Sequence, residues 1–249
     1  EGEPASTVVQ YVAQQQADLV ILSSHGGSGL ADWCLGSVAQ KILHRSHVST
    51  LLIRPFQPFQ AEQTDLRYQR LLVPLDGSRR AECVLPFATA LAQHYNARPV
   101  LAHIFRHPEM PCQTPLSPED QWLAAQLMAR NREAITTYLE QVQAHLPMES
   151  EVRLLTSENV AAELHELAVA EKTDLLILSA HGYSDGTLWS YGSVITNILL
   201  YGTTPLLIVQ DLKPEEWRPT PAEVALSEQS EHVYRASERF HTRTSDANT

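Results

Sequence analysis

Short apolar runs alternate with longer amphipathic segments along most of the chain. The run at 174–179 is mostly Leu and Ile, the pattern of a strand buried on both faces of a parallel sheet. Such runs predict strands at 69–75, 99–105, 151–155, 174–179 and 205–210, with helices at 79–95, 118–146, 159–171 and from 192 onward. This alternation predicts an α/β fold, a doubly wound, open parallel sheet with strand order 3-2-1-4-5.

A second feature is an ungapped internal repeat. Residues 17–54 match the segment that begins 156 positions later, with pairs such as Asp18 and Asp174, His25 and His181, Gly26 and Gly182, and Gly36 and Gly192. A match of this length indicates a duplication. Residues 1–54, with an amphipathic helix expected over 1–16, hold only half a domain. We expect them to pack on the rest of the chain, on a partner or on a preceding segment.

These patterns divide the chain into four parts. Residues 1–54 are the C-terminal half of a first domain, 55–68 a linker rich in proline and glutamine, and 69–211 a complete domain. Residues 212–249 are rich in Glu, Ser, Thr and Pro, and we expect a mostly disordered tail with one short helix around 220–238.

The loop after 174–179 carries the candidate chemistry. Gly182 permits a positive φ or a close backbone approach, and Gly192 and Ser193 stand where a helix begins, with Ser193 as its expected cap. A helix N-terminus offers unpaired N–H donors and a positive dipole end, which suits a phosphate. Asp76 ends the first strand, which neighbours the fourth in the predicted order, so both features are expected in one cleft. The alternative is that the glycines only shape the turn.

Composition narrows the function classes. The chain has 249 residues, 43% hydrophobic and 19% charged, as in an ordinary globular protein. A net charge of −11 argues against general nucleic-acid binding, although backbone N–H groups can still hold a single nucleotide. The three separated cysteines, Cys34, Cys83 and Cys112, predict neither disulfides nor a zinc site and favour a cytoplasmic protein. No apolar run approaches the roughly 20 residues of a membrane span, and the histidines form no metal-ligand set.

Three stretches resemble the universal stress protein family: PLDGS at 74–78, AHIF at 102–105, and SAHG, nine residues, then GSV at 179–194. With its repeat, the chain resembles a tandem member with a truncated first domain. The resemblance implies an adenine nucleotide alpha hydrolase-like fold and a stress-response regulatory protein that binds ATP or AMP, with or without Mg²⁺. Nucleotide-binding members carry G-x-x-G-x9-G-[S/T]. Here Ser179 replaces the first Gly, while Gly182, Gly192 and Ser193 match.

The resemblance also implies roles for individual residues. Pro74 and Asp76 would line the adenosine pocket, with the Asp76 carboxylate accepting hydrogen bonds from ribose or adenine. Ile104 and Leu178 would pack on the base. Ser179 would keep a small residue at the start of the loop, and the phosphates would be held by Gly182, Gly192, Ser193, Val194 and Ile195.

The first copy is expected to form no complete pocket. It matches the loop at Ser23, Gly26, Gly36 and Ser37, but it has no strand-one Asp. The last strands of the two copies, 48–54 and 205–210, are apolar, and an open apolar edge favours pairing. We expect them to pair within the chain or between the chains of a homodimer.

Catalysis is not expected from these motifs. No lysine of a GK[ST] motif follows the loop, which argues against an efficient NTPase, although weak ATP hydrolysis stays open. Related hydrolases with pyrophosphatase chemistry carry an SGG-x-D-like loop where this chain has DGS. His25 and His181 are expected to brace the loops, since no residue nearby in sequence orients them as a base. The alternative function is a nucleotide-independent interaction module that acts through dimerisation.

Overall fold

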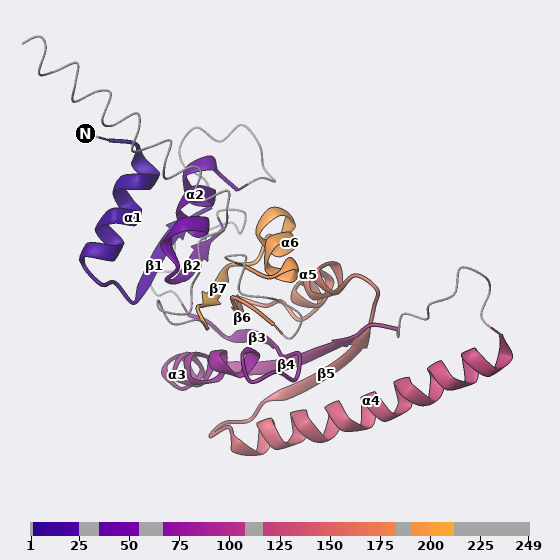
Figure 1. Cartoon of the computed structure of the whole chain (residues 1–249). Helices are drawn as coiled ribbons and strands as arrows, with labels where there is room; N and C mark the ends of the chain where they lie inside the picture. The colour runs from indigo at the N-terminus through magenta and orange to yellow at the C-terminus, as the bar shows by residue number, and fades with distance from the viewer. Residues whose placement is uncertain (1, 25–34, 55–66, 108–116, 183–190, 212–249) are drawn as a thin grey trace, which may run out of the picture. The chain divides into compact units, whose positions relative to one another are not determined.

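The structure is a computed structural model that describes residues 2–24, 35–54, 67–107, 117–182 and 191–211. The strands are β1 Leu19–Ser23, β2 Ser49–Ile53, β3 Arg70–Pro74, β4 Arg98–Phe105, β5 Glu151–Thr156, β6 Leu175–Ser179 and β7 Leu206–Val209. The α-helices are α1 Pro4–Gln14, α2 Ser37–Ser46, α3 Leu85–Tyr95, α4 Pro118–His145, α5 Val160–Ala170 and α6 Ser193–Tyr201. The seven strands form one sheet in the order β1-β2-β7-β6-β3-β4-β5 (Figure 1). Within these ranges no helix has both the length and the apolar character needed to cross a bilayer.

The predicted complete domain, residues 69–211, has the expected strand order. Its strands run β5-β4-β3-β6-β7, which is 3-2-1-4-5 in chain order, and each neighbouring pair is parallel. The predicted doubly wound parallel sheet is therefore confirmed. The last strands also pair, within the chain: β2 and β7 run antiparallel, with Leu51 opposite Leu207. The expected linker and tail, with its short helix, fall largely or wholly outside the described residues.

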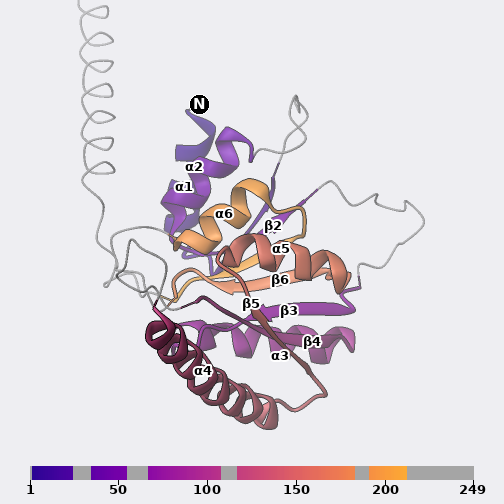
Figure 2. The same cartoon turned by 90° about the vertical axis from the view of Figure 1, so that its right-hand side faces the viewer.

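Side-chain alternation along β6 explains the two helical layers. Leu175 and Ile177 belong to the core under α3 and α4, whereas Leu176 and Leu178 belong to the core under α5 and α6 (Figure 2). All four are nearly inaccessible, with exposed fractions between 0% and 7%. Because both faces of the strand are covered, the sequence is a continuous apolar run instead of an alternating one.

Two helix starts illustrate how local sequence sets the elements. α4 begins as expected, with Ser117 Oγ accepting a hydrogen bond from the Asp120 N–H at 3.1 Å. The single helix expected over 79–95 is instead a 3₁₀ turn, Ala81–Val84, followed by α3. Pro86 explains this difference, because proline lacks an N–H and suits the first turn of an α-helix better than its interior.

The described residues of segments 4–54 and 160–210 share their backbone geometry at the 156-residue offset. α1 and α5 each span 11 residues and begin at corresponding positions. The N–H of Gly36 donates to the carbonyl oxygen of Ser24 at 2.8 Å, and the N–H of Gly192 donates to that of Ala180 at 3.0 Å. The correspondence therefore begins upstream of the sequence match, which starts at residue 17.

Two buried polar side chains connect these segments. Arg54, which follows β2, is 3% exposed, and its Nη2 donates to the carbonyl oxygens of Ile198 (3.0 Å) and Leu199 (2.9 Å). Burial lowers the pKa of Arg54 to about 10, and the negative end of the α6 dipole favours the cation there. Tyr191 Oη donates to the carbonyl oxygen of Leu43 in α2 at 3.0 Å. The helix α6 is thus held by the first segment as well as by its own domain.

Candidate functional site

Asp76 and Gly182 meet where β3 and β6 end. These strands are parallel neighbours, with Leu71 opposite Leu175, so their carboxyl ends lie at the same edge of the sheet. A Cβ placed on Gly182 would lie 2.5 Å from Oδ2 of Asp76, closer than real Cβ contacts come. The backbone of Gly182 does not have a positive φ. Glycine is needed here because the carboxylate leaves no space for a side chain.

The Asp76 carboxylate is oriented by the turn that follows it. Its Oδ1 accepts a hydrogen bond from the Ser78 N–H at 2.9 Å. Gly77 adopts a φ of +84°, a region that glycine enters without steric cost. Asp76 is exposed, so a ligand at the edge of the sheet can reach the carboxylate from solvent.

The residues expected around a base share one face of the sheet beside Asp76. Leu178 belongs to the core beneath α5 and α6, and Ile104 packs against that core while remaining partly exposed. Pro74 follows Leu72, another member of that core, by two residues, so strand alternation puts it on the same face. These side chains form an apolar surface at the carboxyl ends of β3, β4 and β6.

Hydrogen bonds fix both ends of the loop between β6 and α6. Ser179 Oγ donates to the carbonyl oxygen of His181 at 2.6 Å, which tightens the start of the loop. At the other end, the Gly192 N–H donates to the carbonyl oxygen of Ala180 at 3.0 Å. The first turn of α6 therefore lies close to the end of β6. Residues 183–190, between these anchors, lie outside the described part of the chain.

The start of α6 differs from the expectation at Ser193. Gly192 occupies the N-cap position in an extended conformation, and Ser193 is the first helical residue and is exposed. The prediction that Ser193 caps the helix is wrong, because the chain enters the helix one residue too early for its side chain to do so. Ile195 is 3% exposed and belongs to the core. The backbone N–H groups of Ser193, Val194 and Ile195 can face an anion, whereas that of Gly192 is bonded to Ala180.

A buried ionic network lies beside the start of this loop. Nδ1 of His181 is 2.7 Å from Oδ1 of Asp211, and Nε of Arg80 donates to Oδ2 of Asp211 at 2.6 Å. The side chains of His181 and Asp211 are 1% and 2% exposed. Burial alone would raise the pKa of Asp211, but the hydrogen bonds from His181 and Arg80 outweigh it and hold the pKa below its ordinary value.

Sequence reasoning missed Asp211 and Arg80. The expectation for His181 concerned only residues nearby in sequence, whereas the carboxylate that orients it comes from Asp211, which is distant in sequence. Arg80, His181 and Asp211 follow β3, β6 and β7, three adjacent parallel strands whose carboxyl ends share an edge. A search for polar residues just after each predicted strand could have found the network.

His103 lies next to the candidate cleft. Its Nδ1 is 2.7 Å from the carbonyl oxygen of Leu75, the residue before Asp76. Burial lowers the pKa of His103 more than the Leu75 hydrogen bond and the Asp76 charge raise it, so the neutral imidazole is favoured. Among the described residues, no group of three or more His, Cys, Asp or Glu side chains could hold a metal ion.

The first segment offers only part of this arrangement. Gly36 takes the N-cap position of α2, as Gly192 does in α6, and Ser37 begins that helix. Ser23 ends β1 in the register of Ser179 in β6. Within the described residues, however, β1 pairs only with β2, so nothing stands where β3 and Asp76 stand beside β6. Gly26 lies outside the described part.

The chain is similar to a known protein family over most of its length. The model of the universal stress protein family matches residues 1–54 and 67–210. Universal stress protein MJ0531 of Methanocaldococcus jannaschii is 33% identical over 54 residues, which cover 22% of this chain and 32% of that protein. The match thus spans about a third of that relative.

Solved structures support the fold. The functionally unknown protein PA1789 from Pseudomonas aeruginosa PAO1 has a TM-score of 0.62 at 13% identity, over 84% of this chain and 69% of its own. Universal stress protein UspA from Lactobacillus plantarum has a TM-score of 0.51 at 16% identity, over 58% of this chain and 99% of its own. Likeness at such identities concerns the fold alone, whereas the family match covers most of the sequence. The chain therefore belongs to the universal stress protein family.

Proposed function

We propose that this chain binds an adenine nucleotide, ATP or AMP, at the carboxyl ends of β3 and β6 and acts as a regulatory protein in a cytoplasmic stress response. The observation that carries the proposal is the contact between Asp76 and Gly182, where a Cβ would lie 2.5 Å from the carboxylate. It brings a hydrogen-bond acceptor from the first strand against the glycine loop of the fourth. An acceptor next to a loop that can hold an anion suits a nucleoside phosphate, which carries hydroxyl donors and negative charge.

Each part of the nucleotide has a matching surface in this proposal. Asp76 would accept hydrogen bonds from ribose or adenine, with Pro74, Ile104 and Leu178 supplying the apolar surface under the base. The phosphates would lie at the first turn of α6, where backbone N–H groups and the helix dipole favour an anion. Backbone donors matter here because acidic side chains outnumber basic ones in a chain of net charge −11. Mg²⁺ would add positive charge there.

We propose binding without efficient hydrolysis. The first turns of α6, SVITNI, contain no cation that could reach a terminal phosphate. His181 is oriented by Asp211, but its side chain is 1% exposed. A group so enclosed suits a structural role at the loop better than proton transfer to a ligand in solvent.

Isothermal titration with ATP and AMP, with and without Mg²⁺, tests the proposal. Gly192→Glu adds a carboxylate at the phosphate position, and we expect affinity to fall by about tenfold or more, the cost of an unfavourable or unmade charged contact. Gly36→Glu is the matched control, because Gly36 holds the same N-cap position in α2, whose flanking strands β1 and β2 do not neighbour β3. Its affinity should equal that of the wild type. Asp76→Ala should also weaken binding.

The outcome that contradicts the proposal is equally defined. The proposal would be wrong if no adenine nucleotide produced binding heat or shifted the melting temperature. An equal loss in Gly36→Glu and Gly192→Glu, with unchanged melting temperatures, would place the nucleotide away from the α6 site.

A second candidate function is a nucleotide-independent interaction module that acts through dimerisation. One observation favours it: Leu19 and Ile21 of the edge strand β1 are 45% and 63% exposed. Apolar side chains on an open edge are a site for association. Light scattering of the wild type and of Ile21→Asp would support this function if a dimer formed and the variant were monomeric. A monomeric wild type would refute it.

A further inference from the structure

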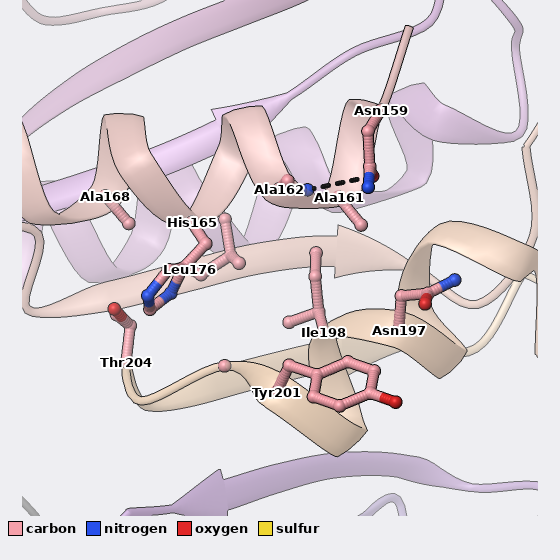
Figure 3. Close-up of a pocket in the computed structure, with 11 residues that line it drawn as sticks. Asn159, Ala161, Ala162, His165, Ala168, Leu176, Asn197, Ile198, Tyr201 and Thr204 are labelled. Atoms are coloured by element: carbon pink, nitrogen blue, oxygen red, sulfur yellow. Dashed lines mark hydrogen bonds between the residues drawn. The ribbon is translucent and has the colours of Figure 1, made fainter.

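A cavity of about 310 Å³ lies between α5 and α6, away from the candidate nucleotide site. Figure 3 shows α5 along one side and α6 along the other, with Leu176 of β6 and Ile198 at its floor. None of the residues expected to bind nucleotide lines it. Its size lies at the small end of the range of ligand pockets in proteins, roughly 300–1,000 Å³.

The corresponding space between α1 and α2 is bridged by charged side chains. At the positions of Asn159 and Asn197 the first segment has Glu3 and Lys41, whose carboxylate and ammonium groups are 2.6 Å apart. At the position of Tyr201 it has Arg45, whose Nη1 lies 3.4 Å from Ser6 Oγ. These contacts hold α1 to α2 across the mouth of the groove.

The two grooves also differ in the side chains of their interiors. Val9, Val12 and Val48 contribute to an apolar cluster between α1, α2 and β1. Their counterparts in the second segment are His165, Ala168 and Thr204, which line the cavity. The backbone is shared, so the cavity is produced by side chains. Where the first segment has valine, the second has a smaller residue at one position and polar residues at two, and where the first has the Glu3–Lys41 pair the second has two amides.

The polar groups lie at the two ends of an apolar slot. In Figure 3, His165 is directed toward Thr204 at one end, while Asn159 and Asn197 lie at the other. Asn159 and His165 are six residues apart at α5, which separates the ends by about 9 Å along the helix axis. The described residues that line the cavity include no Asp, Glu, Lys or Arg.

One side of the slot carries an aromatic ring. Tyr201 is 69% exposed, and Figure 3 shows its ring lying alongside Ile198 at the α6 side of the cavity. Aromatic rings pair with one another in offset or edge-to-face arrangements. A flat ring therefore has an apolar floor beneath it and an aromatic neighbour at its edge.

From this arrangement we infer that the α5–α6 cavity is a second ligand site, which binds a small uncharged aromatic molecule with a hydrogen-bonding group at each end of its ring. The ring occupies the slot over Leu176 and Ile198. One polar group meets His165 and Thr204. The other meets Nδ2 of Asn159 and Oδ1 of Asn197, because Oδ1 of Asn159 already accepts from the Ala162 N–H and Nδ2 of Asn197 already donates to the carbonyl oxygen of Ser193. A charged group is disfavoured because none of the charged pairs of the first segment is retained.

Saturation-transfer NMR on the full chain tests the site with 4-hydroxybenzamide, a neutral ring with a polar group at each end. Benzamide, which lacks one end, should bind roughly two- to tenfold more weakly, as expected for the loss of one hydrogen bond. The charged 4-hydroxybenzoate should also bind more weakly. Saturating ATP should leave the 4-hydroxybenzamide signal unchanged, which separates this site from the proposed nucleotide site.

The decisive variant installs the residues of the first segment, His165→Val, Ala168→Val and Thr204→Val together. It should keep or raise the melting temperature, since it fills a cavity, and abolish saturation transfer to the probe. No transfer in the wild type, or equal transfer in the filled variant, would overturn the inference. A change in molecular mass of the filled variant, seen by light scattering, would also overturn it and assign the groove to contact between copies of the chain.

Discussion

The strands β1 and β6 occupy corresponding positions in two segments of like backbone, yet their environments are opposite. In β6, Leu175 and Ile177 are 1% and 0% exposed, whereas their counterparts in β1, Leu19 and Ile21, are 45% and 63% exposed. The local sequence is enough to form strand, loop, helix and strand in both places. Burial, by contrast, is decided by the neighbours, because β3 and α3 cover β6 and have no described equivalents beside β1.

The same difference decides where a ligand site can form. The loop glycines exist in both segments, but among the described strands a parallel neighbour followed by Asp76 lies only next to β6. A glycine loop at a helix start is thus half of the proposed site. The other half is supplied by the topology of a complete domain.

The largest expected effect comes from placing a charge on both strands. Ile177→Asp buries an unpaired carboxylate, and we expect the free energy of unfolding to fall by more than about 4 kcal/mol. Ile21→Asp is the matched variant on the exposed strand, and its loss should stay within about 0.5 kcal/mol. Urea denaturation followed by circular dichroism measures both.

The comparison breaks if the two variants lose similar amounts of stability. Ile21 would then be covered in solution by another molecule, and sedimentation of the wild type would show an assembly. A small loss in both variants would instead mean that the face of β6 beneath α3 is more accessible than the structure shows.

Much of the fold could be predicted because its signals are local. The Leu and Ile run of β6 identifies a strand covered on both faces, and alternation with helices implies parallel order. For the last strands, the sequence predicted pairing either within the chain or between two chains. An apolar edge indicates that a strand pairs, but it does not indicate which chain supplies the partner. Pro86 could have indicated the break before α3, but the amphipathic pattern is continuous over 79–95 and therefore predicted a single helix.

Only part of the candidate site could be predicted, because some of its contacts follow from the predicted strand order and others do not. The proximity of Asp76 and Gly182 followed from strand order. The Asp211 carboxylate could not be paired with His181 from spacing, since the contact depends on β7 lying next to β6. The cavity between α5 and α6 was also hidden, because it is a difference in side chains between two segments whose sequences match elsewhere.

A second prediction concerns the network that anchors the loop of the second segment. The residue corresponding to Asp211 in the first segment is Pro55, so only the second has this carboxylate. The pKa of Asp211 is lowered in the folded protein, so its ionised form stabilises the fold above the ordinary aspartate pKa. This stabilisation is lost as the pH falls through the lower folded pKa.

We therefore expect Asp211→Asn to lose about 2 kcal/mol at pH 7, the scale of hydrogen bonds to a charged group. The gap between variant and wild type should shrink as the pH falls below the ordinary aspartate range. Urea unfolding at a series of pH values measures it, with the exposed Glu166→Gln as control. A gap that does not depend on pH would mean that the carboxylate charge does not stabilise the loop.

The smallest effect sharpens the comparison between the two helix pairs. Glu3 has a pKa of about 2, lowered first by the hydrogen bond from Lys41 and then by that from Ser6. Because the folded pKa is depressed, the ion pair contributes to stability above the ordinary glutamate pKa, and this contribution disappears as the pH falls from 4.5 toward 2.

Lys41→Asn installs the residue found at the corresponding position in α6. We expect the pKa of Glu3 to rise toward 4.5, measured by carbon NMR of its carboxyl group, while the melting temperature hardly changes, since exposed ion pairs stabilise little. Asn197→Lys is the matched control and should leave the pKa of Glu3 unchanged. A pKa that stays near 2 in Lys41→Asn would show that Lys41 does not bridge α1 and α2. The contrast with the open α5–α6 groove would then rest on the valines and on Arg45.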